Sequence, residues 1–513
     1  MKRFLILSLS VNLLIRCSDS GNIISSSKGS KPLHFNLTTS HVTEPVGLLN
    51  YDGYYHLFYI TSEESKFHKT NSIGHSISND LINWTESSKS VFTEYNNSIL
   101  KGGIVFDSNN ITGYGTDKNP PLIAVLTRTE ITDSTSEDIK KVLPVLAYST
   151  DGGDSWKVTT DKISFPESFI KNPQNVGIVW HETTKKWIMS IALSNHVQFY
   201  SSPDLRLWNF ESLIGSDFFP EEIEWVRSTL FPLSDEFHWV LTADIKNTGN
   251  EKSSGGTVYF IGYFDGHNFI NQSSLLHWLD YGQNIYGSLI SIGKDDRRIN
   301  IGWVKNDNID GQFKKAGNNG SGIITLPREL SLGNMNGEWF ISMSPLTELK
   351  EIYGKETQLG LLKVSYKVDD LELISNLKVP VELILKFNTS NIQKGSFPIH
   401  FGVKFWNKRG KDLTFGYDRF GYYYIDKSGL VPSSGTQISE DLIKMPCDHS
   451  DSTMSIRFII DISAIECFAE DGKLVMTHSF SSEERFNRIT LFTEKGNIDL
   501  LEGKIVRLKT ILN

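Results

Sequence analysis

The feature that most constrains this fold is a recurring run of β-branched and aromatic residues that ends in a turn rich in Gly, Asp, Asn or Ser. Such runs occupy residues 54–60, 122–126, 187–193, 257–264 and 299–304. Helical periodicity is scarce, and the clearest helix signal is short, at residues 345–352. The pattern predicts an all-β protein and leaves propeller, barrel and sandwich architectures open.

A loose internal repeat narrows this choice. Four segments share one plan, in which a strand is followed by an Asp-bearing turn and then by an aromatic residue: 78–84 (SNDLINW), 148–156 (YSTDGGDSW), 202–208 (SPDLRLW) and 263–269 (YFDGHNF). The Asp side chain can accept backbone N–H groups inside such a turn. The segments are spaced by roughly one four-stranded propeller blade. We interpret them as structural hairpins rather than functional sites.

The character of the chain changes after residue 352. Long alternating strands follow, at residues 381–387, 399–405 and 455–460. One apolar face per strand is typical of a two-sheet sandwich. We therefore place a domain boundary near residues 350–358, with one domain over residues 30–350 and a second over residues 358–513.

The N-terminus predicts a signal peptide over residues 1–20. Lys2 and Arg3 precede an apolar stretch at 4–15, which is too short to span a bilayer as a helix. An apolar N-terminal strand is the alternative, and no other stretch approaches the length of a membrane span. We expect a secreted glycoprotein, whose glycosylation signals begin at Asn36, Asn83, Asn96, Asn110, Asn271, Asn319 and Asn388.

Composition excludes several classes of protein. The chain has 51 Lys and Arg against 60 Asp and Glu, and no long basic run that would suit nucleic acid. Cys/His spacings typical of a metal site and Gly-rich phosphate loops are also absent, so neither a metal nor a cofactor is expected. Cys447 and Cys467 would remain in the mature chain, either as a disulfide or as two free thiols.

Six short motifs follow one another along the chain: 73–84 (IGHSISNDLINW), 186–189 (KWIM), 200–205 (YSSPDL), 301–303 (IGW), 326–330 (LPREL) and 465–472 (IECFAEDG). Together they resemble glycoside hydrolase family 32, the invertases, inulinases and levanases, over essentially the whole mature chain. The resemblance implies a five-bladed β-propeller followed by a C-terminal β-sandwich, and β-fructofuranosidase chemistry.

Retaining hydrolysis requires a carboxylate nucleophile and a carboxylic acid about 5–5.5 Å apart. By resemblance, the nucleophile position falls on Glu44, the transition-state stabiliser on Asn172 and the acid/base on Val226, so all three are substituted. A valine neither gives nor takes a proton, which forfeits a contribution of about 10²–10⁴ in rate. Glu224, two residues earlier, is a candidate substitute acid or else an ordinary solvated glutamate.

The family positions that grip the sugar are substituted as well. They fall on His41, Thr43, Ile60, Ile73 and Lys171. A further family segment, Ser-Gly-Ser, reads Lys-Gly-Gly and begins at residue 101. Scaffold matches thus survive where site matches do not.

Three functions follow as hypotheses. The first is a family member with lost or strongly reduced hydrolase activity, which binds a carbohydrate or a protein or neither. The alternative is an active hydrolase of sucrose or fructan-type fructosides with Glu44 as nucleophile, although Glu44 could also be a loop carboxylate held extended by Pro45. The third, a sialidase, rests on one Asp-box turn at 149–156 and would need an arginine triad and a tyrosine nucleophile that the sequence does not locate.

Overall fold

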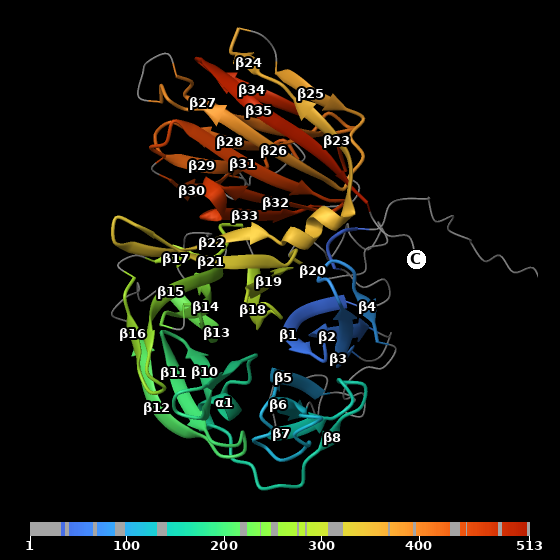
Figure 1. The fold of residues 1–513 in the computed structure, drawn as a ribbon, viewed down its shortest axis with the longest axis vertical. Helices are drawn as coiled ribbons and strands as arrows, with labels where there is room; N and C mark the ends of the chain where they lie inside the picture. Colours follow the sequence, from blue (N-terminus) through green and yellow to red (C-terminus); the bar gives the residue numbers. More distant parts are fainter. Residues whose placement is uncertain are drawn as a thin grey trace, which may run out of the picture.

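The fold was analysed in a computed structural model, drawn in Figure 1. The residues that it describes are 32–35, 41–64, 69–87, 98–130, 141–215, 223–235, 237–247, 255–273, 276–282, 285–305, 322–367, 370–392, 397–430, 442–447, 449–480 and 485–509. The predicted signal peptide and the glycosylation signals at Asn36, Asn96 and Asn319 lie outside them.

The N-terminal half folds into five antiparallel sheets, which follow one another along the chain (Figure 1). The first two blades contain β1 (His41–Tyr51), β2 (Tyr54–Glu64), β3 (Lys69–Ser78) and β4 (Thr85–Glu86), then β5 (Ser98–Phe106), β6 (Leu122–Glu130), β7 (Lys141–Ser149) and β8 (Lys157–Val158). A short helix, α1 (Glu167–Lys171), precedes the third blade, β9 (Gly177–His181), β10 (Lys186–Leu193), β11 (His196–Ser202) and β12 (Asn209–Gly215).

The last two blades each carry one extra short strand. The fourth contains β13 (Ile223–Pro232), β14 (Trp239–Asn247), β15 (Gly256–Phe264) and β16 (Phe269–Asn271), with β17 (His277–Trp278) paired to β15. The fifth contains β18 (Ile285–Ile292), β19 (Arg298–Lys305), β21 (Arg328–Met335) and β22 (Glu338–Pro345), with β20 (Gly322–Ile324) paired to β19.

The first strand of every blade faces the centre of the ring. β1 contacts both β5 and β18, β9 contacts β5 and β13, and β13 contacts β18. This closed circuit of neighbours is the arrangement of a propeller, in which each blade presents its innermost strand to a shared axis. The predicted fold class is therefore confirmed in its first domain.

The four Asp-bearing turns occupy equivalent places, between the third and fourth strand of the first four blades. Asp80 accepts the backbone N–H groups of Ile82 and Asn83 at 2.9 and 2.7 Å, and Asp265 accepts those of His267 and Asn268 at 2.8 and 2.7 Å. The turns at Asp151 and Asp204 are closed in the same way. Their interpretation as structural hairpins agrees with these contacts.

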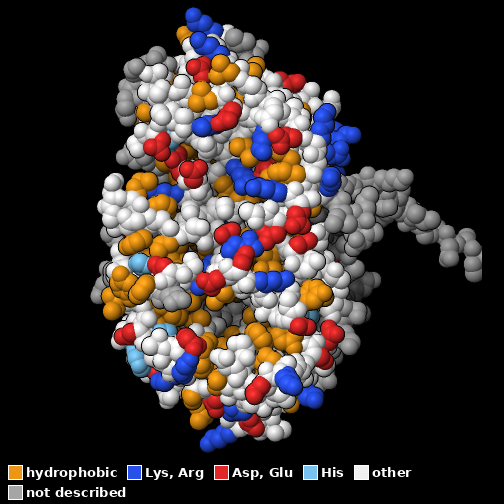
Figure 2. Space-filling view, viewed as in Figure 1, with side chains coloured by type: hydrophobic (Ala, Val, Ile, Leu, Met, Phe, Trp, Pro, Cys, Tyr) orange, Lys and Arg blue, Asp and Glu red, His pale blue; other side chains and the backbone are white. Residues whose placement is uncertain are grey.

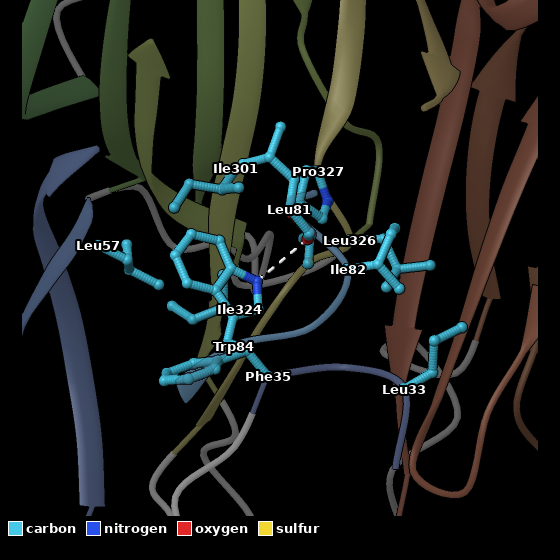
Figure 3. Close-up of a pocket in the computed structure, with 11 residues that line it drawn as sticks. Leu33, Phe35, Leu57, Leu81, Ile82, Trp84, Ile301, Ile324, Leu326 and Pro327 are labelled. Atoms are coloured by element: carbon cyan, nitrogen blue, oxygen red, sulfur yellow. Dashed lines mark hydrogen bonds between the residues drawn. The ribbon is translucent and has the colours of Figure 1, made fainter. Parts of the chain in front are cut away.

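Residues 32–35 join the first and last blades. The backbone N–H of Ile324 in β20 donates to the carbonyl of Phe35, and the Phe35 ring packs edge-on against Tyr59 and Trp84. Figure 3 shows the apolar pocket that results, in which the Trp84 Nε1–H donates to the Leu81 carbonyl at 3.1 Å. The N-terminal segment thus bridges the first and fifth blades at the point where the ring closes.

The second domain is a sandwich of two antiparallel sheets, which lies beyond the fifth blade (Figure 1). It begins after a 3-10 helix, η3 (Thr347–Ile352), where a short helix was predicted. One sheet contains β23 (Tyr353–Leu359), β35 (Asn497–Leu508), β26 (Val381–Asn388), β31 (Thr453–Ile460), β32 (Ala464–Ala469), β33 (Leu474–Ser479) and β24 (Leu362–Ser365). The other contains β25 (Leu371–Ser375), β34 (Phe486–Glu494), β27 (His400–Asn407), β28 (Asp412–Asp418), β29 (Tyr422–Asp426) and β30 (Leu442–Pro446).

The sandwich encloses one large aromatic and aliphatic core, which includes Phe405, Phe415 and Phe458. Cys447 and Cys467 are not joined by a disulfide. Within the described part of the chain, no helix has the length and apolar character needed to cross a bilayer.

A buried polar network connects the two domains. Arg328, in the last blade, binds Glu466 and Asp280 with N–O distances of 2.9 and 2.7 Å. His34, in the N-terminal segment, contacts Glu466 at 3.0 Å and Asp461 at 2.9 Å. Because all five side chains are buried, the network fixes the sandwich against the propeller.

Candidate functional site

Polar side chains from several blades meet near the propeller axis, and Glu44 is among them. Glu44 lies in β1, opposite Ile60 of β2, between two irregularities of strand register. Its Oε2 atom lies 2.7 Å from Lys101 Nζ of β5 and 2.5 Å from Asn175 Nδ2, just before β9. Glu44 therefore enters the centre of the molecule, but one of its oxygens is already bound by a cation and an amide.

The structure brings Asn175, and not Asn172, to Glu44. Asn172 is exposed at the C-terminal end of α1, where its side-chain amide donates to the Ser168 carbonyl at 3.3 Å. Asn175 is buried, and its Oδ1 accepts the backbone N–H of Gly102 at 3.2 Å. The stabiliser position on Asn172 stays a prediction from its motif: the Asn-Pro pair ends a helix, and the amide that contacts Glu44 is that of Asn175, three residues later.

Val226 lies at a bulge in β13. The register with β14 shifts between Trp225 and Arg227, which leaves Val226 without a cross-strand partner. Its side chain is half-buried, whereas Glu224 is exposed and lies opposite Lys246. In a regular strand, Glu224 and Val226 would lie on the same face because they are two residues apart. This alternation does not hold across a bulge.

Arg227 and Asp244 face each other across β13 and β14, and both are buried. Asp244 accepts the Thr257 hydroxyl at 2.5 Å and the backbone N–H of Gly287 at 2.7 Å. Burial raises the pKa of Asp244, an effect that Arg227 and these hydrogen bonds oppose and the charge of Glu44 reinforces. Asp244 is therefore a second carboxyl group in the electrostatic range of Glu44, with both oxygens accepting bonds from the protein.

The remaining predicted sugar-binding positions are apolar, exposed to solvent or outside the described residues. Ile60 and Ile73 are buried, directly opposite each other in β2 and β3. Lys171 is exposed and pairs with Glu167 on its own helix, at 2.7 Å. The side chains of His41 and Thr43 lie outside the described residues.

No group of His, Cys, Asp or Glu in the described part of the chain has the geometry of a metal site. Figure 2 shows acidic and basic side chains interspersed over one face of both domains. The described cluster at the axis is likewise mixed in charge, with two carboxylates and two cations.

Sequence reasoning missed Asn175, Asp244 and the part played by Arg227. Counting back from the strand that contains Trp180 would have indicated Asn175. An aspartate inside the apolar strand of 239–245 is itself an unusual feature, because charged residues are rarely buried without a partner. Arg227 was visible beside Val226, but only the fold shows that its side chain is enclosed.

Comparisons with known proteins give one family for both domains. The model of the glycosyl hydrolases family 32 N-terminal domain matches residues 34–343, and that of the family 32 C terminal matches residues 348–508. A levanase of Bacillus subtilis (strain 168) is 26% identical over 93% of this chain and 70% of its own length. An extracellular exo-inulinase of Meyerozyma guilliermondii is 25% identical over 85% of this chain and 86% of its own.

Solved structures show the same fold. The exo-inulinase of Aspergillus awamori superimposes with a TM-score of 0.77 at 22% identity, over 94% of this chain and 99% of that one. A fructofuranosidase of Schwanniomyces occidentalis in complex with fructosylnystose gives 0.77 at 20% identity, over 94% and 98% of the two chains. With family models that together span nearly all of the described residues, the chain belongs to glycosyl hydrolase family 32.

Proposed function

We propose that this protein is a secreted member of the family that has lost most or all hydrolase activity and binds a carbohydrate in the propeller funnel. The observation that carries the proposal is the state of the acid/base position. Val226 occupies it by sequence, at a bulge, and among the described residues no carboxyl group contacts Glu44. A valine at this position cannot protonate the departing sugar oxygen.

The environment of Glu44 supports the same conclusion. The Glu44 Oε2 accepts bonds from Lys101 and Asn175, which stabilise the charge of the carboxylate and so weaken it as a nucleophile. Glutamate is also one methylene longer than aspartate, and a displacement of about 1 Å can cost about 100-fold in rate. Asn175 carries no charge with which to stabilise a positively charged transition state.

Asp244 does not supply the missing acid. Both of its oxygens accept hydrogen bonds from inside the protein, and the side chain is fully buried. A general acid must reach the leaving oxygen directly or through one water. The described geometry therefore supports binding rather than turnover.

A binding role is supported by what remains in the funnel. Glu44, Lys101, Asn175 and Arg227 offer donors and acceptors from four different blades, which suits a ligand with many hydroxyl groups. Secretion is supported by the predicted signal peptide and by relatives that include an extracellular exo-inulinase.

Two assays of the purified protein test the proposal. We expect no turnover of sucrose, inulin or levan above that of a Glu44→Ala variant, and saturable binding of a sugar from the same set by calorimetry. Turnover that disappears in Glu44→Ala would establish the alternative, an active fructoside hydrolase with Glu44 as nucleophile. Failure of the protein to bind any of these sugars would refute the carbohydrate role.

A further inference from the structure

The guanidinium group of Arg227 is buried with donors that no described residue accepts. Its side chain is 6% exposed, and neither Nε nor Nη1 has a hydrogen-bond partner. We infer that Arg227 is the principal ligand-binding residue of the funnel and donates to oxygens of an uncharged sugar. This inference rests on the proposed carbohydrate-binding function and names the residue and ligand class that it would use.

The guanidinium lies between the innermost strands of three blades. Arg227 itself belongs to β13, its Nη2 donates to the Pro45 carbonyl of β1 at 3.3 Å, and its Nη1 lies against Gly287 of β18. A Cβ atom added to Gly287 would stand 2.9 Å from Nη1, so the glycine provides the space that the guanidinium fills. The free donors are therefore at the axis, one residue along β1 from Glu44.

Protein groups nearby do not satisfy these donors. Asp244, which faces Arg227 across the sheet, uses its oxygens for Thr257 and for the backbone of Gly287. An unmet donor in a buried place is destabilising, and more so when it is charged. Most such groups in native proteins have a partner, so two unpartnered N–H groups between the innermost strands β1, β13 and β18 indicate an acceptor that arrives with a ligand.

The shape of the guanidinium favours several separate oxygens over one carboxylate. The Nε–H and Nη1–H bonds lie on different edges of the planar group, whereas a carboxylate pairs with two parallel N–H bonds on one edge. A sugar presents hydroxyl oxygens in several directions. Glu44 Oε1, which accepts no hydrogen bond from the described residues, could in turn accept a sugar hydroxyl.

Charge balance also favours an uncharged ligand. Glu44 and Asp244 are opposed by Lys101 and Arg227, so the formal charges sum to zero. An anionic sugar would add a negative charge close to the carboxyl groups of Glu44 and Asp244, which is unfavourable. A neutral sugar satisfies the free donors without disturbing this balance.

The variant Arg227→Lys tests the assignment, because it keeps the charge and removes the planar donors. Calorimetric titration with fructose, sucrose, 1-kestose, glucose and glucuronate is expected to show binding of a neutral sugar to the wild type. The variant should bind that sugar about 10-fold to 100-fold more weakly. Lys157→Met, which removes an exposed cation on β8, is the matched control and should bind like the wild type.

A crystal structure of the wild type with the bound sugar gives a second readout that does not depend on a variant's folding. Sugar oxygens within about 3.2 Å of Arg227 Nε and Nη1 are expected. Unchanged binding by folded Arg227→Lys, preference for glucuronate over glucose, or a sugar seated away from Arg227 would each overturn the inference alone. A wild type that binds none of the neutral sugars would instead defeat the proposed function, and this assignment with it.

Discussion

At the scale of single residues, the carboxylate of Glu44 is paired with groups from neighbouring blades. Lys101 Nζ and Asn175 Nδ2 both bind the Oε2 atom of Glu44. On the function proposed above, these contacts favour Glu44 as a ligand-binding carboxylate over a nucleophile. Val226 supplies no proton donor, so the proposed loss of hydrolysis is distributed over several positions.

This arrangement predicts a gain of catalysis from two changes. Val226→Glu restores a carboxyl group at the acid position, and Lys101→Ser frees Glu44. The double variant should hydrolyse levan or sucrose at least about 100-fold faster than the wild type, because a positioned general acid contributes about 10²–10⁴. Release of fructose measures the effect.

The matched control is Val226→Gln with Lys101→Ser, which has nearly the same shape but cannot donate a proton from a carboxyl group. Equal rates in the two double variants would show that residue 226 does not reach the leaving oxygen.

Sequence predicted part of this site. Glu44 and Val226 were placed by motifs whose trailing residues are intact, and the structure puts Glu44 at the axis. The motif that pointed to Asn172 is an Asn-Pro pair, and only the path of the chain after α1 shows that the neighbouring amide of Asn175 is the one that contacts Glu44. The pairing of Arg227 with Asp244 depends on a strand register that a bulge shifts, and a bulge leaves little signal in one sequence.

At the scale of elements, the Asp turns hold the third and fourth strands of the blades together. Asp80 accepts two backbone N–H groups, the Asn83 amide and the Ser78 hydroxyl. Although partial burial alone would raise it, these hydrogen bonds lower the pKa of Asp80 below its usual 3.8. The turn is therefore built around an ionised carboxylate.

Asp80→Ala should lower the free energy of unfolding by about 1–3 kcal/mol at neutral pH, because several turn donors lose their acceptor. A depressed pKa stabilises the fold above the unfolded value and loses that effect as the pH falls through the folded pKa. The difference from wild type should therefore shrink below about pH 3.8. Urea denaturation at pH 7 and pH 3 measures it, with the exposed Asp117→Ala as a control. A difference that grows in acid would contradict this account.

Most elements could be predicted because they are determined locally. Alternating apolar residues and Asp turns predicted strands at 54–60 and 257–264, and both formed with the expected bounds to within a few residues. The number of blades came from family resemblance, since closure of the ring depends on contacts between distant strands such as β1 and β18. The contacts of residues 32–35 with the first and fifth blades have no periodic signal in the sequence and could not be anticipated.

At the scale of the whole molecule, the buried network between propeller and sandwich makes stability depend on pH. Burial alone would lower the pKa of His34, but hydrogen bonds to Asp461 and Glu466 raise it to about 9 from the usual 6.5. A raised pKa contributes stability that is complete below pH 6.5 and is lost as the pH rises through 9.

The wild type should therefore lose up to about 3 kcal/mol of stability from this group between pH 6.5 and pH 9. In His34→Gln the loss over the same interval should be much smaller, while His267→Gln, at an exposed histidine, should follow the wild type. Denaturation midpoints at several pH values provide the comparison. Parallel pH profiles for wild type and His34→Gln would rule out His34 as the titrating group.

Arg328 is the cation on which this interface depends most. Its guanidinium binds Glu466 of β32 and Asp280 after β17, and its side chain is 2% exposed. Arg328→Met removes the charge with little loss of volume and leaves two buried carboxylates without their main counterion. Breaking a buried ion pair in this way costs about 3–5 kcal/mol. The variant should unfold at a much lower urea concentration than the wild type, with unfolding followed by tryptophan fluorescence.

Lys386→Met, which breaks an exposed pair with Glu502 on the sandwich, should cost at most about 1 kcal/mol. Because Arg328 extends from the fifth blade to the sandwich, its loss should also separate the unfolding of the two domains into two calorimetric transitions. A single transition, displaced no further than that of the Lys386 variant, would show that apolar contacts alone hold the domains together.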